Sequence, residues 1–135
     1  MRIGLIMSRE LCVHNPKNVL IVDNDLNQRL SLSLILKRAG YLVTTVGFAC
    51  EALERLQTGN YNLIILDIAP IENRLTLLPS ILRQYPHISV LAVTAKGSPE
   101  TTSEINALGI SAQLEKPVTA KSLMECVDII LKEPA

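Results

Sequence analysis

The sequence predicts an α/β protein in which a parallel five-stranded sheet lies between two layers of helices. Short apolar, β-branched runs alternate five times with stretches whose apolar residues recur at helical spacing. The connections are short and rich in Gly, Pro, Asn and Ser, which are common turn residues. This alternation implies parallel strands joined by right-handed crossovers, with helices on both faces. We therefore expect a flavodoxin-like (βα)5 three-layer sandwich with strand order 2-1-3-4-5.

The composition indicates one compact domain with no charge bias. The chain has 135 residues, of which 48% are hydrophobic, and 13 basic side chains balance 13 acidic ones. This balance argues against direct nucleic-acid binding and against an anionic membrane surface. Apolar stretches are too short to cross a bilayer and the N-terminus lacks a signal-peptide pattern, so we expect a cytoplasmic protein. Cys12, Cys50 and Cys126 are widely spaced and odd in number, which predicts free thiols.

Three segments differ in character along the chain. Residues 1–17 form an N-terminal extension of unknown structure that ends in the turn-rich stretch Asn15–Asn18. Residues 18–132 carry the alternating pattern and form the predicted domain, and residues 133–135 are a tail.

Two apolar runs end in carboxylates. Leu63–Leu66 runs directly into Asp67, and Val19–Val22 runs into Asp23-Asn24-Asp25. A continuous apolar run suits a strand that is covered on both faces. Ligands of open α/β sheets bind at the carboxyl ends of such strands. Asp67 is therefore placed for chemistry, although a strand-end Asp can also simply cap a turn or a helix.

The first helix is predicted over Leu26–Ala39 and should end at Gly40 in the C′ position. Its apolar residues cover so many helical positions that we expect a broad buried stripe. These positions are Leu26, Leu30, Leu34, Leu32, Ile35, Leu36 and Ala39.

The remaining elements follow the same periodicity. Pro79 lies inside the third predicted helix, which should therefore kink or begin late, near Leu78, because proline removes a backbone hydrogen bond. The predicted strands are Tyr41–Val46, Ile88–Val93 and Ser111–Glu115, and the predicted helices are Ala49–Gln57, Asn73–Tyr85, Glu100–Leu108 and Ala120–Lys132.

Four strand ends should bring reactive groups to one edge of the sheet: the Asp23–Asp25 acids, Asp67, Thr94 and Lys116. Neighbouring carboxylates repel each other and need a cation, and oxygen ligands of this kind fit Mg²⁺. A carboxylate beside such an ion can attack a phosphoryl group and form an acyl phosphate, with an ammonium group offsetting the charge. Each residue also has a structural alternative, with Asp23 as a cap, Thr94 as a strand residue and Lys116 as a solvated charge. Nucleotide-binding glycine motifs are absent from the sequence.

The motifs at these strand ends resemble those of the receiver domain of two-component response regulators. They are V-L-I-V-D-N-D at Val19–Asp25, L-I-I-L-D at Leu63–Asp67, V-T-A at Val93–Ala95 and E-K-P at Glu115–Pro117. The resemblance covers Lys17–Lys132.

The resemblance implies a role for each site residue. Asp67 would accept a phosphoryl group from a histidine kinase or phosphotransfer protein. The metal position would hold Mg²⁺ through Asp23, Asn24, Asp67 and the backbone carbonyl of Ala69. The phosphoryl-binding and switch residues would be Thr94, Ala95 and Lys116, and the Lys116–Pro117 peptide bond would be cis.

The family also suggests a surface for a downstream partner or effector domain, formed by residues 100–108, 111–115 and 120–132. A homodimer is left open, as is the question of whether the chain acts alone or belongs to a longer regulator.

Three departures from the family pattern bear on function. Asn24 replaces the second acidic residue, which should weaken Mg²⁺ binding, and Asp25 is a candidate auxiliary acid. Pro70 lies three positions after Asp67 where the family usually has four, so the loop is one residue short. Gln113 occupies the aromatic switch position, which puts its coupling to Thr94 in doubt.

Three functional hypotheses follow. The leading one is a phosphoryl-accepting receiver whose output is binding, not turnover of an external substrate. The second is an interaction module of the same fold that works without phosphorylation, which the three departures favour. A small magnesium-dependent phosphatase is the remote third, because the sequence offers no obvious second general acid beside Asp67 and no substrate cap.

Overall fold

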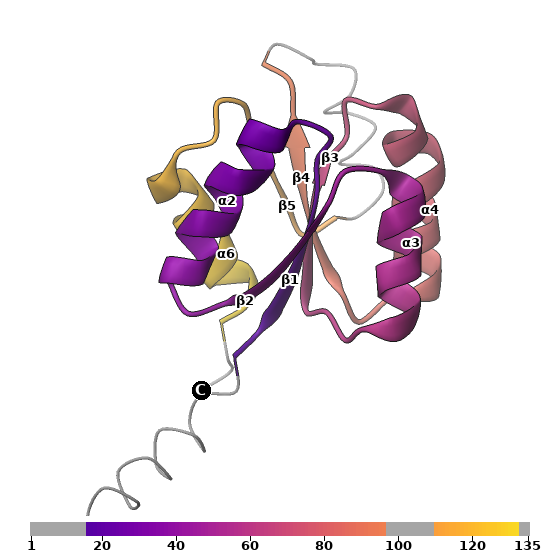
Figure 1. Cartoon of the computed structure of the whole chain (residues 1–135), viewed down its shortest axis with the longest axis horizontal. Helices are drawn as coiled ribbons and strands as arrows, with labels where there is room; N and C mark the ends of the chain where they lie inside the picture. Colours follow the sequence, from indigo (N-terminus) through magenta and orange to yellow (C-terminus); the bar gives the residue numbers. More distant parts are fainter. Residues whose placement is uncertain (1–15, 97–109, 133–135) are drawn as a thin grey trace, which may run out of the picture.

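A computed structural model describes residues 16–96 and 110–132. Its parallel five-stranded sheet has the order β2-β1-β3-β4-β5, which confirms the predicted topology. Helices cover both faces of this sheet (Figure 1). The strands are β1 (Asn18–Val22), β2 (Leu42–Val46), β3 (Leu63–Asp67), β4 (Ser89–Thr94) and β5 (Ala112–Glu115).

Two helices lie on each face of the sheet in the described part of the chain (Figure 1). On one face are α2 (Leu26–Arg38) and α6 (Ala120–Ile130), and on the other are α3 (Ala49–Thr58) and α4 (Leu78–Gln84). The predicted helix Glu100–Leu108 and most of the N-terminal extension lie outside the described residues. Across residues 16–96 and 110–132, every helix is too short or too polar to span a membrane.

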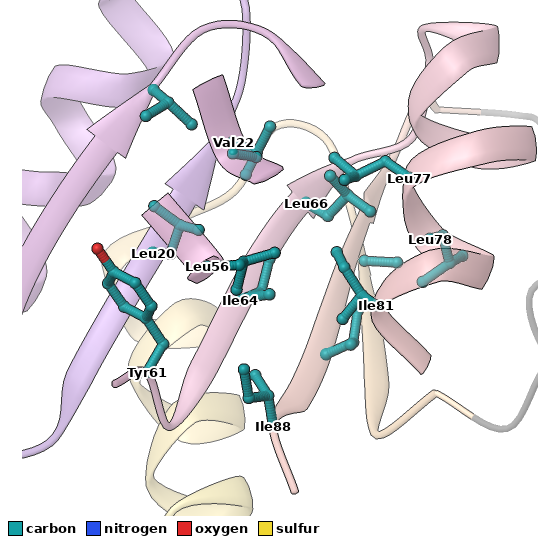
Figure 2. Close-up of a cluster of buried hydrophobic side chains, with 14 of the residues drawn as sticks. Leu20, Val22, Leu56, Tyr61, Ile64, Leu66, Leu77, Leu78, Ile81 and Ile88 are labelled. Atoms are coloured by element: carbon teal, nitrogen blue, oxygen red, sulfur yellow. The ribbon is translucent and has the colours of Figure 1, made fainter. Parts of the chain in front are cut away.

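Strand β3 is the centre of the core, with all five of its residues buried. Because successive strand residues point to opposite faces, β3 contributes to two hydrophobic clusters. Ile64 and Leu66 pack with Leu78 and other residues under α3 and α4, as Figure 2 shows. Leu63 and Ile65 pack in a second cluster under α2 and α6. Burial on both faces fixes the strand that ends in Asp67.

The predicted broad buried stripe of α2 is wrong in part. Leu32 and Leu36 are buried, but Leu26, Leu30 and Leu34 are 56%, 57% and 51% exposed. Leu30 and Leu34 each lie two residues from Leu32, which is about 200° around a helix, so they point away from the sheet. Ala39, the C-cap that follows Arg38, is also exposed.

Gly40 ends α2 as predicted. Its φ is +98°, a left-handed conformation that favours glycine. Its N–H donates to the Lys37 carbonyl, which satisfies an acceptor at the helix end.

The α-helix that contains Pro79 begins late, at Leu78, as the sequence predicts. A π-helical turn, η1 (Asn73–Leu77), precedes it, and the Leu78 N–H donates to the carbonyl of Asn73, five residues back. Pro79 has no N–H to bond to the carbonyl four residues back. The wider turn is therefore located where the regular hydrogen-bond ladder could not continue.

Candidate functional site

Four strand ends meet at the carboxyl edge of the sheet. Val22 pairs with Leu66 in the central strands, so the residues that follow them, Asp23 and Asp67, lie on adjacent strand ends. Both side chains are buried, at 2% and 3% exposure. Thr94 ends the next strand and is 3% exposed. The predicted site residues of β1, β3 and β4 are therefore gathered in one place.

Lys116, the residue that follows β5, completes this edge. Its Nζ lies 3.0 Å from Asp67 Oδ2, and its backbone N–H donates to the Thr94 carbonyl. The second oxygen of Asp67, Oδ1, accepts the Ala69 N–H at 3.0 Å. The Lys116–Pro117 peptide bond is cis, the geometry that the resemblance predicts. Asp67 and Lys116, which are far apart in the sequence, thus form an ion pair.

Among the residues that the structure describes, Asp23 carries a buried oxygen without a hydrogen-bond partner. Its Oδ1 accepts the Asp25 N–H at 2.9 Å, whereas Oδ2 is buried and unpaired. Burial raises the pKa of the Asp23 carboxyl above its ordinary value, and the negative charges of Asp67 and Asp25 add to this rise. The Asp25 hydrogen bond and the Lys116 charge oppose it. A cation would remove both the repulsion and the unpaired oxygen.

The donor set at this edge fits a hard cation such as Mg²⁺. In the described part of the chain, no three His, Cys, Asp or Glu side chains are grouped around one point. A cation would therefore need oxygens besides the two carboxylates of Asp23 and Asp67. The side chain of Asn24 and the backbone carbonyl of Ala69 are the candidates, and Mg²⁺ characteristically keeps several waters in addition.

Asp25, the candidate auxiliary acid, has a structural role at the start of α2. Its Oδ1 accepts the N–H groups of Asn27 and Gln28, at 2.9 and 3.3 Å. Asp25 is therefore the N-cap of α2, since it satisfies two of the donors left unpaired at a helix start.

The switch positions take no part in the ion pair in this conformation. The hydroxyl of Thr94 donates to the Leu114 carbonyl on β5 at 3.4 Å, and Ala95 is exposed just beyond it. Gln113 is half-buried, and its Oε1 has no hydrogen-bond partner in the part of the chain that the structure describes.

Two residues that the sequence analysis did not assign to the site hold the main chain beside the acids. Arg29 Nη1 donates to the Asp23 carbonyl at 2.7 Å. Asn73 is buried, and its Nδ2 donates to the Asp67 carbonyl at 2.8 Å. In the sequence Asn73 is only the first residue of a predicted helix, and Arg29 is only a helix residue. Their contacts are to backbone atoms, which no residue pattern identifies.

We expect Asp23→Asn to stabilise the metal-free protein at pH 7 by about 1–3 kcal/mol, because the neutral amide removes a buried charge and its repulsion by Asp67. The folded state raises the pKa of Asp23, so it binds this proton more tightly than the unfolded chain does. Ionisation of Asp23 therefore lowers stability as the pH rises above the unfolded value of 3.8. The gain from the variant should shrink as the pH is lowered towards that value. Urea unfolding in EDTA at the two pH values measures both effects.

Asp25→Asn is the matched control, because asparagine also caps helices well and Asp25 is exposed. It should change stability little. A loss of stability on Asp23→Asn at pH 7 in EDTA would contradict the inference that the buried charge of Asp23 destabilises the metal-free protein.

The fold and this edge define a doubly wound α/β protein with an acidic site opposite a lysine. The family "Response regulator receiver domain" matches residues 19–128. The chain belongs to the response regulator receiver family.

Named relatives support this assignment. The DNA-binding transcriptional regulator NtrC of Bradyrhizobium sp. is 32% identical over 118 residues, which are 87% of this chain and 25% of that protein. Protein PetR of Rhodobacter capsulatus is 36% identical over 121 residues, 87% of this chain and 50% of that protein. The chain thus spans between a quarter and half of the length of these two relatives.

Solved structures show the same fold. The chemotaxis response regulator CheY4 of Vibrio cholerae has a TM-score of 0.78 and 29% identity, with 87% of this chain and all of that chain covered. NtrX from Brucella abortus has a TM-score of 0.79 and 28% identity, with 87% of this chain and 26% of that chain covered.

Proposed function

We propose that this receiver accepts a phosphoryl group on Asp67 from a histidine kinase or phosphotransfer protein in the presence of Mg²⁺. A carboxylate oxygen of Asp67 attacks phosphorus, the P–N bond to the donor imidazole breaks, and its electron pair stays on the imidazole nitrogen. The observation that carries this proposal is the Asp67–Lys116 ion pair beside the unpaired Oδ2 of Asp23.

Each residue of the site has its own role in this proposed transfer. Lys116 lies close enough to Asp67 to follow the transferred oxygens and offset their charge. Asp23, Asn24, Asp67 and the Ala69 carbonyl would hold Mg²⁺, which supplies further positive charge when bound. Asn73 and Arg29 keep the main chain of the two acids in place.

The output that we propose is a change in binding. Phosphorylation adds roughly two negative charges to a buried edge, which favours conformations that bring donors such as the Thr94 hydroxyl towards Asp67. Part of the expected partner surface, β5 and α6, adjoins this edge through Lys116. A downstream partner or effector domain would bind this surface in the cytoplasm. The receiver itself would not turn over an external substrate.

Incubation with acetyl phosphate and Mg²⁺ tests this function. We expect one base-labile phosphoryl group by intact mass spectrometry and none in Asp67→Asn. Asn24→Asp should be labelled at Mg²⁺ concentrations lower by on the order of tenfold, because it adds a carboxylate near the cation. Absence of label on a folded wild-type chain would overturn the proposal.

A phosphorylation-independent interaction module is the second candidate. Asn24 at the second acidic position favours it, and so does Gln113, whose Oε1 has no partner among residues 16–96 and 110–132. This module would bind its partner equally well as wild type and as Asp67→Asn, whereas the receiver would respond to phosphorylation.

A further inference from the structure

The outer face of α2 carries three leucines that the fold leaves uncovered. Leu26, Leu30 and Leu34 are spaced by four residues and are each more than half exposed, and we call them the leucine stripe. Residues four apart lie above one another on a helix, so the stripe is continuous. Single exposed leucines are ordinary. This row is different because α2 already has a complete inner face at Leu32 and Leu36.

The two ends of the leucine stripe carry opposite charges. Asp25 lies exposed at its start, next to the acidic edge of the sheet. Lys37 and Arg38 lie exposed in the last turn of α2. If a second copy of this surface packs against the first in the antiparallel direction, the acidic end of each copy lies beside the basic end of the other.

We propose that two copies of this chain associate through their leucine stripes, with the α2 helices antiparallel around a two-fold axis at Leu30. Leu30 then contacts Leu30 of the second copy, and Leu26 contacts Leu34 of the second copy. Such an interface is isologous, because one patch serves both sides. Helices that pack through leucine ridges approach to about 8–10 Å between axes. Lys37 and Arg38 of each copy face the Asp25 end of the other.

The charge pattern selects a second copy over an unrelated helix, because the chain itself supplies both complementary ends. One helix pair buries an area at the low end of specific interfaces, below about 1,200 Å² in total, so the dimer is weak and reversible. Its interface adjoins the acidic edge, since Leu26 follows Asp25 directly. The dimer depends on surface side chains and does not require phosphorylation of Asp67.

Sedimentation velocity across a range of protein concentrations tests the dimer. We expect reversible self-association of the wild type and at least a tenfold weaker dimer for Leu30→Glu, which places two carboxylates at the axis. Leu75→Glu is the matched control, because Leu75 is 59% exposed and lies in η1, before α4 on the other face of the sheet. This variant should associate like the wild type.

Cysteine cross-linking tests the antiparallel geometry. In a background where Cys12, Cys50 and Cys126 are serine, Leu30→Cys should oxidise to a covalent dimer by itself. Leu26→Cys should not, but its mixture with Leu34→Cys should form a mixed disulfide, since these positions face each other. A wild type that stays monomeric at every concentration, an unaffected Leu30→Glu variant, or self-linking of Leu26→Cys would each overturn the proposal. The proposal would also be overturned if the leucine stripe proved necessary only for binding of a phosphotransfer protein.

Discussion

Replacing Lys116 with methionine is expected to slow phosphorylation of Asp67 by about 10²–10³-fold, the usual effect of removing one preorganised charge-stabilising donor. Its Nζ lies 3.0 Å from Asp67 Oδ2, so the ammonium is already positioned where phosphoryl charge develops. Methionine keeps an unbranched side chain but lacks the charge. The rate of labelling by acetyl phosphate at saturating Mg²⁺ measures the effect.

Lys121→Met is the control for Lys116→Met. Lys121 is an exposed lysine in the first turn of α6, so its loss removes the same net charge from the neighbourhood without touching Asp67. Equal slowing in both variants would show that net charge matters and the ion pair does not. An unchanged rate in Lys116→Met would exclude the role of its ammonium group.

The position of the site could be predicted from the sequence because the strands of a parallel sheet all end at the same edge. Each central strand is an apolar run buried on both faces, and the first polar residue after the run marks its carboxyl end. The β1–β3 pairing therefore places Asp23 beside Asp67, and the β4–β5 pairing brings Lys116 to Thr94. Residues far apart in the chain meet because sheet geometry leaves little choice.

The orientation of α2 could not be predicted in the same way. Leu30 and Leu32 both lie in apolar rows at helical spacing, and periodicity does not tell which row faces the sheet when both faces of a helix are apolar. The structure buries Leu32 and exposes Leu30.

The separate roles of the neighbouring acids could also not be predicted from the sequence. In Asp23-Asn24-Asp25, the residue that caps the following helix depends on backbone angles, and it is Asp25, with φ −88° and ψ 114°. The hydrogen bonds of Arg29 and Asn73 to main-chain carbonyls depend on the path of each loop. Side-chain type alone does not fix such a path.

Ile64→Ala is expected to lower the free energy of unfolding by about 2–5 kcal/mol, because it opens a cavity in a core that has little room to collapse. Ile64 is fully buried in β3 and packs between both neighbouring strands and the α3–α4 layer (Figure 2). Urea unfolding at pH 7 measures the change.

Two further variants should lower the free energy of unfolding by smaller amounts. Ile64→Val removes one methylene and should cost about 0.5–1.5 kcal/mol, and Leu42→Ala, at a half-exposed position of edge strand β2, should cost less still. This order follows from the amount of apolar surface that each change removes from the core. If Ile64→Ala were as mild as Leu42→Ala, β3 would not be the packed centre of the sheet. Asp67, three residues further along the same strand, would then lack the rigid support that holds it against Lys116.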